Sequence, residues 1–178
     1  GFIVSNAAEA TTQGAEFDLS FRPAEGTSLY ASWGYSDARF DTFKDGPCTA
    51  ANGGDFCDLS GSRLPRAPKY SATLGGNTAI PLWRDSVALM LGADVNWRDD
   101  ILFDLDADPL DSQDGYFMVN LHAGLVDPDG RWQLMAHVKN LENKTIRHFA
   151  ADMPIFSGSH MGFLLPPRTV SAELRLNL

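Results

Sequence analysis

The chain has 178 residues, with 23 acidic side chains against 14 Lys and Arg side chains and a formal charge of −9. Hydrophobic residues make up 44% of it, which is typical of a folded protein and argues against wholesale disorder. A net negative chain is poorly suited to binding phosphates, so nucleic acid is not expected as a partner. The longest unbroken apolar stretch, Val87 to Leu91, is far shorter than the roughly 18 residues of a membrane-spanning helix.

Apolar side chains recur at every second position in seven segments, whereas helical periodicity is almost absent. Successive side chains of a strand point to opposite faces, so each segment has one apolar face and one polar face. A short apolar stretch at 2–4 could add a strand stub. The seven predicted strands lie, in chain order, at 16–21, 29–36, 70–75, 87–98, 117–125, 132–139 and 170–178.

Between the second and third predicted strands lie two cysteines, Cys48 and Cys57, in a stretch rich in Gly, Asp, Asn and Ala. Their even number and loop-like setting predict a disulfide, and with it an oxidising compartment. The alternative is two unrelated free thiols.

The alternation fits two kinds of all-β protein, a soluble antiparallel sandwich and a transmembrane barrel. Strand length favours the barrel, because 87–98 alternates over twelve residues. Soluble strands typically run about 5–6 residues, whereas a tilted strand that crosses a bilayer needs about 9–11. Aromatic residues near strand ends also resemble the interfacial girdle of a barrel. These aromatic residues are Trp33, Tyr35, Trp97, Tyr116, Phe117 and Trp132.

The connections between the predicted strands alternate in length. In an antiparallel meander, alternate connections lie on the same rim, so one rim carries short turns and the other long loops, as in outer-membrane barrels. Seven strands and the stub could be stretched to a closed eight-stranded barrel, but the stub is too short to cross a bilayer. The chain is therefore interpreted as the C-terminal section of a larger barrel. The short turns are 23–26, 81–85 and 127–130, and the long loops are 41–65, 99–113 and 143–166.

This interpretation assigns each strand face an environment. If it is wrong, the polar rows are instead the wetted face of a sandwich. The residues expected to face lipid are Val87, Leu89, Leu91, Val95, Trp97, Leu174 and Leu176. The residues expected to face the lumen are Asp94, Asn96, Arg98, Asn120, His122, His137, Lys139, Glu173 and Arg175, together with Asp18 and Tyr30.

The sequence contains no G-x-S-x-G, H-E-x-x-H or P-loop motif, so an enzyme is not predicted and no cofactor is expected. His122 and His137 could share a metal, but two hydrogen-bonded histidines are the favoured interpretation because no further ligands share their spacing. Asp104, Asp106 and Asp108 imitate the start of a Ca²⁺-binding loop. Pro109 occupies the position where that loop requires Gly, so a solvated loop is the default expectation.

Four motifs, in order along the chain, resemble the TonB-dependent outer-membrane receptors. They are N-A-A-E-A with Q-G-A-E-F at 6–10 and 13–17, L-P-R-A-P-K-Y at 64–70, H-V-K-N-L with a following Lys at 137–144, and P-R-T at 167–169. The chain departs from the family in two places. Glu142 stands where the family usually has an aromatic residue, and Leu178 stands where a terminal aromatic is usual.

The resemblance implies a Gram-negative outer-membrane receptor with roughly 22 strands around a plug. Residues 1–178 would be its C-terminal barrel part, with the plug, the TonB box and the first strands outside this chain. The implied partners are outer-membrane lipid, the plug, the remaining strands, the TonB complex and a scarce nutrient. A ferric siderophore is favoured over cobalamin or an oligosaccharide. The alternatives are a passive porin-like or anchoring barrel and a soluble β-sandwich binding module.

Overall fold

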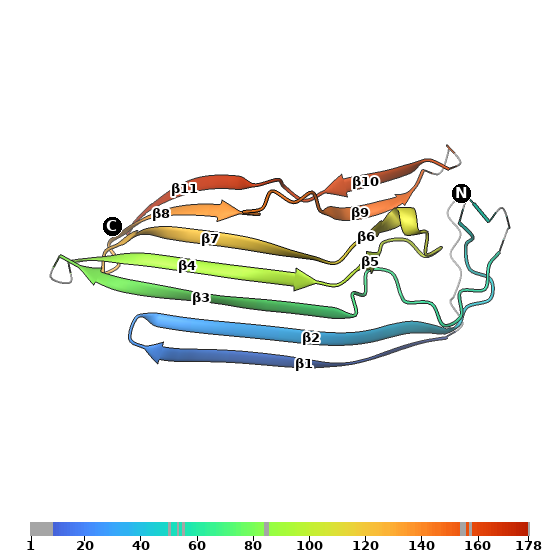
Figure 1. The fold of residues 1–178 in the computed structure, drawn as a ribbon, viewed down its shortest axis with the longest axis horizontal. Coiled ribbons are helices and arrows are strands. Elements are labelled where there is room, and N and C mark those ends of the chain that lie inside the picture. The colour runs from blue at the N-terminus through green and yellow to red at the C-terminus, as the bar shows by residue number, and fades with distance from the viewer. Residues whose placement is uncertain are drawn as a thin grey trace.

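The computed structural model describes residues 9–177, except positions 50, 53, 55, 84, 85, 154, 155 and 157. One sheet dominates it, with seven antiparallel strands in the order β1-β2-β3-β4-β7-β8-β11 (Figure 1). The seven strands confirm the predicted all-β meander, and the predicted stub at 2–4 lies outside the described residues. The strands are β1 Glu9–Ala24, β2 Thr27–Thr42, β3 Tyr70–Leu82, β4 Val87–Arg98, β7 Tyr116–Val126, β8 Trp132–Lys139 and β11 Thr169–Leu176.

The long connections are more ordered than predicted. Two of the segments expected to be plain loops contain small paired elements, which lie at the right-hand end of Figure 1. Their runs of two to six residues are too short to show a clear alternation. Among the described residues, no helix has the length and apolarity needed to cross a membrane. The additional elements are β5 Ile101–Leu102, the 3₁₀ turn η1 Pro109–Asp111, β6 Ser112–Gln113, β9 Arg147–Asp152 and β10 His160–Leu164, with β5 paired to β6 and β9 to β10.

Strand β2 is also longer than its alternation predicted. Up to Tyr35 its apolar side chains occupy odd positions, but beyond that point the buried residues are Ala38 and Phe40. The following loop covers them, because the Phe40 amide donates to the Ser62 carbonyl (3.0 Å) and the Phe40 ring packs on Phe43 at 4.8 Å. In the last part of β2, the loop therefore packs on the face opposite to the apolar row. Because the buried side chains change face there, the alternation pattern does not extend to the end of the strand.

The two rims of the sheet differ, as the connection lengths predicted. Short turns join β1 to β2, β3 to β4 and β7 to β8 at the left-hand end of Figure 1. The connections β2 to β3, β4 to β7 and β8 to β11 run far out from the opposite rim. The long connections of the described residues are thus gathered at one rim.

A buried carboxylate closes the turn between β7 and β8. Asp127 accepts hydrogen bonds from the Arg131 backbone amide (3.0 Å) and from its guanidinium nitrogens Nε (2.6 Å) and Nη2 (2.9 Å). The guanidinium lowers the pKa of Asp127 to about 2. Beside it, the Asn177 side chain donates to the Gly130 carbonyl (2.6 Å) and fixes the end of β11 against the same turn.

The apolar rows of the strands lie on one face of the sheet, and no second layer of described residues covers them. The pairing register places five of these side chains in one row across five strands, and Leu134 and Leu174 in that row are 48% and 63% exposed. An apolar face of this extent is incompatible with a soluble sandwich, which would bury it against a second sheet. The row consists of Ile80, Leu89, Leu125, Leu134 and Leu174.

An aromatic row borders this face next to the long loops. Phe17, Trp33, Ala72, Trp97 and Phe117 pair in register across five strands, so four of five positions at one level are aromatic. On β3, ten residues separate this level from the end of the strand at position 82. That separation is about 33 Å along the strand and, at a tilt near 40°, about 25 Å along the membrane normal, the height of a bilayer-spanning apolar band.

Both edges of the sheet are open. Strand β1 pairs only with β2, strand β11 pairs only with β8, and every residue of both edge strands is exposed. Unpaired edge amides and carbonyls cost several kcal/mol each in a bilayer, so further strands must flank this sheet where it spans a membrane. The fold is therefore that of part of a barrel.

Candidate functional site

The polar face of the sheet carries a connected set of side chains around Asp94. The amides of Asn96 and Asn120 both donate to the Asp94 Oδ2 atom, at 2.6 and 2.8 Å. The Thr73 hydroxyl donates to the Asn96 Oδ1 atom (3.0 Å). At the far side, the backbone amide of Asn140 donates to the Asn120 Oδ1 atom (3.0 Å). The structure thus joins three of the predicted lumen residues into one network that runs from β3 to the end of β8.

The two predicted lumen histidines lie on neighbouring strands of the same face. The His122 and His137 rings are 5.9 Å apart, and His122 covers Gly92, where a side-chain methyl group would collide with its ring. The His137 Nε2 atom is 4.0 Å from Glu173, which pairs with Arg175 on the same strand at 3.0 Å. These residues extend the polar row to the sheet edge, and among the described residues they do not form a three-ligand metal group.

Two further predicted lumen residues lie at the loop end of their strands. Lys139 ends β8, and Arg98 ends β4 and is exposed. Arg98 lines a cavity of about 440 Å³ between the polar face and the loops, together with Asn96, Arg147 and His148. This cavity brings three basic side chains to the loop end of the polar face, so it is suited to an anionic solute.

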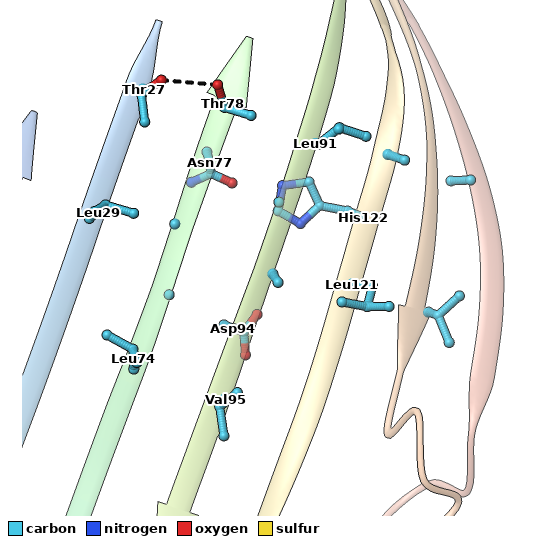
Figure 2. Close-up of a pocket in the computed structure, with 17 residues that line it drawn as sticks. Thr27, Leu29, Leu74, Asn77, Thr78, Leu91, Asp94, Val95, Leu121 and His122 are labelled. Atoms are coloured by element: carbon cyan, nitrogen blue, oxygen red, sulfur yellow. Dashed lines mark hydrogen bonds between the residues drawn. The ribbon is translucent and has the colours of Figure 1, made fainter. Parts of the chain in front are cut away.

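A second cavity, of about 1000 Å³, lies against strands β2, β3, β4, β7 and β8 (Figure 2). Most of its lining side chains belong to the apolar rows, and small residues such as Gly76 and Ala93 create its depth. Polar side chains such as Asn77, Asp94 and His122 line it as well. Its apolar lining is suited to acyl chains rather than to a polar solute.

The motif around Asn140 has a structural role that the sequence did not reveal. Asn140 is almost fully buried and has a φ of 54°. Its side chain accepts from the Lys144 amide (2.9 Å) and donates to the Lys144 carbonyl (2.8 Å), which closes a tight loop after β8. The Lys144 ammonium lies 3.2 Å above the Phe117 ring, so the loop is bound to the aromatic row.

The last motif of the chain is tied to the same loop. The Asn143 side chain accepts from the Arg168 amide (2.9 Å), and the Arg168 guanidinium approaches the Leu141 carbonyl (3.4 Å). Two motifs that are 25 residues apart in sequence therefore form one structural unit at the loop ends of β8 and β11.

The motif before β3 connects two long loops. Arg66 adopts a φ of 61°, and its amide donates to the Leu102 carbonyl (2.7 Å). Its guanidinium lies over the Phe149 ring of β9, 5.3 Å from the ring centre. The chain segment that enters β3 thus organises the loops around the mouth of the sheet.

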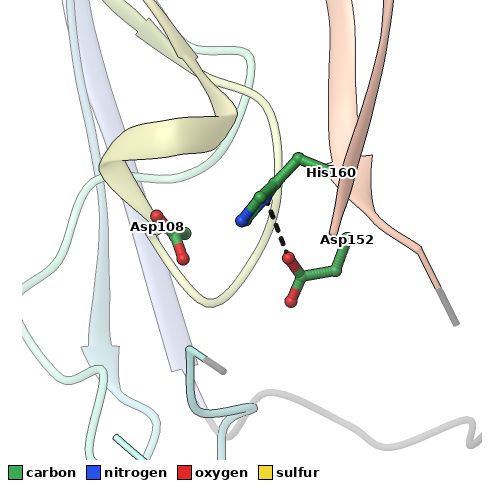
Figure 3. Close-up of side chains that lie close together, drawn as sticks. All are labelled: Asp108, Asp152 and His160. Atoms are coloured by element: carbon green, nitrogen blue, oxygen red, sulfur yellow. Dashed lines mark ion pairs between the residues drawn. The ribbon is translucent and has the colours of Figure 1, made fainter. Parts of the chain in front are cut away.

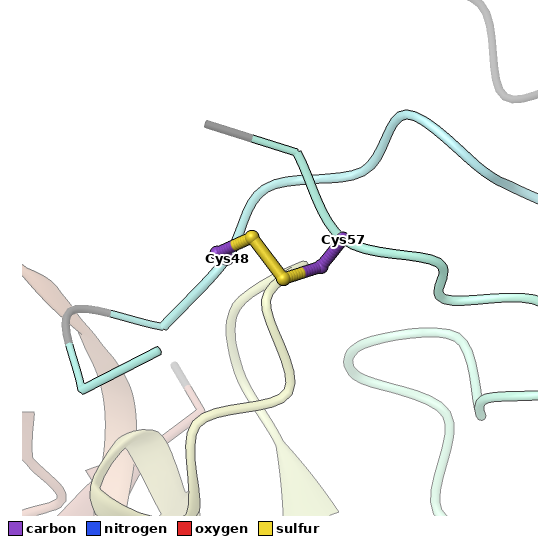
Figure 4. Close-up of a disulfide and its surroundings, with 2 residues drawn as sticks. All are labelled: Cys48 and Cys57. Atoms are coloured by element: carbon purple, nitrogen blue, oxygen red, sulfur yellow. A yellow bond between two sulfur atoms is a disulfide. The ribbon is translucent and has the colours of Figure 1, made fainter. Parts of the chain in front are cut away.

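The structure contains a disulfide between Cys48 and Cys57 in the loop that joins β2 to β3 (Figure 4). The adjacent backbone is paired as well, since Gly46 and Cys57 exchange hydrogen bonds of 2.9 and 2.8 Å. The bond lies in a loop outside the apolar band, so its constraint acts on the loop and not on the spanning strands.

Replacement of Cys48 and Cys57 by Ser in the full-length protein is expected to leave the barrel folded but to loosen this loop. By closing a ten-residue loop, the disulfide lowers the conformational entropy of the unfolded loop, which stabilises the folded loop by about 3 kcal/mol. We expect unchanged electrophoretic mobility without heating and faster protease cleavage within residues 43–69. Equal cleavage rates of the variant and the oxidised wild type would contradict the prediction.

The acidic connection between β4 and β7 holds Asp104 and Asp106 in local turn contacts. Asp104 and Asp106 accept hydrogen bonds from the backbone amides of Leu105 (2.7 Å) and Asp108 (3.1 Å), as in ordinary turns. Of the three weak candidates, Asp108 alone lies in a potential metal-binding group among the described residues, and its partners are on the β9–β10 hairpin (Figure 3). The sequence pattern missed those partners because they come from a different loop.

Burial and close carboxylates shift several pKa values in these loops, beyond the aromatic row. Burial raises the pKa of Asp106 and that of Asp152. A hydrogen bond to Asp111 raises the pKa of His160, and the Asp152 carboxylate adds to this effect. A concentration of negative charge therefore surrounds a single imidazole.

Comparisons with known proteins identify the family. The model of the family described as "TonB dependent receptor-like, beta-barrel" matches residues 1–141, most of the chain. The comparison with curated proteins found no match. Among solved structures, the chain is similar to the ferric yersiniabactin uptake receptor FyuA from Yersinia pestis, with 23% identity and a TM-score of 0.75. That alignment covers 94% of this chain and 23% of the receptor.

Two receptors from Acinetobacter baumannii are similar as well. The siderophore receptor PiuA aligns with 20% identity and a TM-score of 0.69, over 93% of this chain and 21% of that one. BauA, the ferric preacinetobactin receptor, aligns with 19% identity and a TM-score of 0.66, over 93% and 22%. The chain thus spans less than a quarter of the length of these receptors. It belongs to the TonB-dependent receptor family, and its sheet is part of that family's β-barrel in the Gram-negative outer membrane.

Proposed function

We propose that this chain is the C-terminal barrel part of an outer-membrane receptor for energy-coupled uptake of a ferric siderophore. The observation that carries the proposal is the two-faced open sheet of a TonB-dependent receptor barrel, with an uncovered apolar face and a connected polar face. The plug and the remaining strands would be supplied by the rest of the protein. In this arrangement the apolar rows contact lipid and the Asp94 network faces the plug and the transport path.

The choice of a siderophore over other nutrients rests on two supports. The similar solved structures are receptors described as binding ferric yersiniabactin, siderophores or ferric preacinetobactin. In addition, Arg98, Arg147 and His148 line the cavity at the loop end of the polar face. Ferric chelates that carry carboxylate, catecholate or phenolate oxygens would be attracted to the guanidinium groups of Arg98 and Arg147. Cobalamin and oligosaccharides carry fewer anionic oxygens that such side chains could attract.

In the proposed mechanism, the loops and the plug hold the ligand. The barrel wall surrounds the plug and presents charged side chains to the transport path. TonB, energised by the proton gradient, then pulls on the plug to open the path. The wall needs no covalent chemistry for this, because transport requires only that the polar face stays wetted and the apolar face stays in lipid. A passive porin-like barrel is the second candidate, and it differs in needing no TonB.

The experiment is uptake of ⁵⁵Fe bound to a panel of siderophores by iron-starved cells with and without the gene. We expect uptake of one siderophore class to be lost in the deletion strain and equally lost when TonB is removed. Uptake that persists without TonB would support the porin alternative instead, and no iron phenotype with any siderophore would contradict the siderophore assignment.

A variant tests the role of the cavity in the same assay. Arg98→Ala is expected to lower siderophore affinity about tenfold or more, since a charge-assisted contact contributes about 1.5–3 kcal/mol. Arg22→Ala is the matched control, because Arg22 lies on β1 near the short-turn rim. If the two variants take up iron equally well, the cavity has no part in ligand binding.

A further inference from the structure

Two long loops meet through a group of carboxylates around one imidazole. Asp108 begins the 3₁₀ turn η1 in the connection between β4 and β7, whereas Asp152 and His160 end β9 and begin β10 in the connection between β8 and β11. One donor atom from each of the three lies within 4.8 Å of the others. Figure 3 shows the His160 ring between the two carboxylates.

A fourth carboxylate lies beside the group and is completely buried. The side chain of Asp111 has no exposed surface, and its Oδ2 atom is 3.1 Å from the His160 Nδ1 atom. The Oδ1 atom of the same carboxylate has no hydrogen-bond donor among the described residues. A buried carboxylate oxygen without a hydrogen-bond donor is costly, so the Asp111 carboxylate adds uncompensated negative charge next to the three grouped side chains.

The imidazole alone cannot satisfy the carboxylates around it. The Asp152 Oδ1 atom lies 3.0 Å from the same Nδ1 atom that Asp111 approaches, yet it also has no properly directed donor among the described residues. One ring nitrogen carries at most one proton, so it can donate to only one of the two oxygens. The nearby Arg147 guanidinium donates to the backbone carbonyls of Leu110 and Ser112 instead.

We propose that Asp108, Asp152 and His160 bind one divalent transition-metal ion that joins the two loops, with the Asp111 carboxylate beside them. The donor set is one imidazole nitrogen and carboxylate oxygens, which is typical of Zn²⁺, whereas Ca²⁺ and Mg²⁺ prefer oxygen ligands throughout. Donors of a tetrahedral Zn²⁺ site are about 3.3 Å apart. The Asp152 and His160 donors are 3.0 Å apart and all three donor atoms lie within 4.8 Å of one another, so binding one ion requires shifts of no more than about 1.5 Å.

The inference goes beyond the proposed function and does not depend on it. A metal at this position would fix the β9–β10 hairpin against η1, at the rim of the barrel that carries the long loops. It would act as a structural tie between two loops, in the same region where the disulfide restrains a third.

The test is metal binding by the full-length receptor, purified in detergent and stripped with a chelator. Zn²⁺ is titrated against a chromophoric competitor, with Ca²⁺ and Mg²⁺ as parallel probes. We expect one Zn²⁺ per chain to bind at this site, with Ca²⁺ and Mg²⁺ at least about 100-fold weaker. His160→Gln and Asp152→Asn are each expected to lower Zn²⁺ affinity about 10- to 100-fold or more. Asp114→Asn, in the same loop but outside the group, is the control and should bind normally.

A second readout follows the loops themselves. Zn²⁺ should slow proteolysis within 140–168 in the wild type and in Asp114→Asn, but not in His160→Gln. Absence of Zn²⁺ binding in the wild type would overturn the proposal, as would binding that survives both His160→Gln and Asp152→Asn. Preferential binding of Ca²⁺ would overturn the assignment of the metal class. Neither assay contains a siderophore. A negative result for Zn²⁺ therefore does not count against the proposed uptake of a ferric siderophore.

Discussion

Leu91→Arg is expected to prevent or severely weaken folding of the receptor in the membrane. Leu91 lies on the apolar face near the middle of β4, between the aromatic row at Trp97 and the strand end at Val87. An Arg side chain at the lipid-facing midplane of a barrel costs about 2–4 kcal/mol. We expect less of the folded form that migrates fast without heating, and a lower temperature at which the remainder unfolds.

The neighbouring residue provides the control. Met90 precedes Leu91 on the same strand, and its side chain points to the polar face because successive side chains alternate. Met90→Arg should therefore fold to nearly the wild-type amount. If both substitutions lowered the amount of folded receptor equally, or if neither lowered it, the two faces of β4 would not differ in their contact with lipid.

Asn140→Ala is expected to produce the second large effect, by releasing the loop that follows β8. The substitution removes two hydrogen bonds to the Lys144 backbone and places Ala at a φ of 54°. The lost hydrogen bonds and the left-handed backbone together cost about 2–4 kcal/mol. We expect faster proteolysis within 140–168 and a lower unfolding temperature in detergent.

Asn140→Gly separates the two causes of this loss. Glycine adopts the left-handed conformation without penalty but cannot form the side-chain hydrogen bonds. It should therefore be more stable than Asn140→Ala by about 1 kcal/mol while remaining less stable than the wild type. Wild-type stability of Asn140→Ala would contradict the role assigned to this motif.

The sequence alone predicts the spanning part of the fold well, for a clear physical reason. Lipid on one face and polar surroundings on the other impose strict alternation, and Val87–Arg98 has the same bounds in the structure as in the pattern. The pattern fails where this constraint ends. Beyond Tyr35, strand β2 buries Ala38 and Phe40 under a loop, on the opposite face, so its last residues carry no consistent period.

The group of acidic residues around His160 could not be predicted from the sequence for a different reason. Asp111 and His160 are 49 positions apart, and only the β9–β10 hairpin brings them together. That hairpin has five- and six-residue strands without a clear alternation, so the sequence indicated a plain loop. Asp94, Asn96 and Asn120, by contrast, are brought together by strand alternation and sheet register alone, so the sequence pattern places them on one face.

The most direct test of the central claim is electrophoresis of the protein from fractionated source cells. Detection uses an antibody against the loop of residues 43–69. We expect an outer-membrane band several times heavier than 19.4 kDa that migrates faster unheated than boiled, as a large closed barrel does. A soluble band near 19.4 kDa whose mobility does not change on heating would contradict a membrane-spanning receptor barrel.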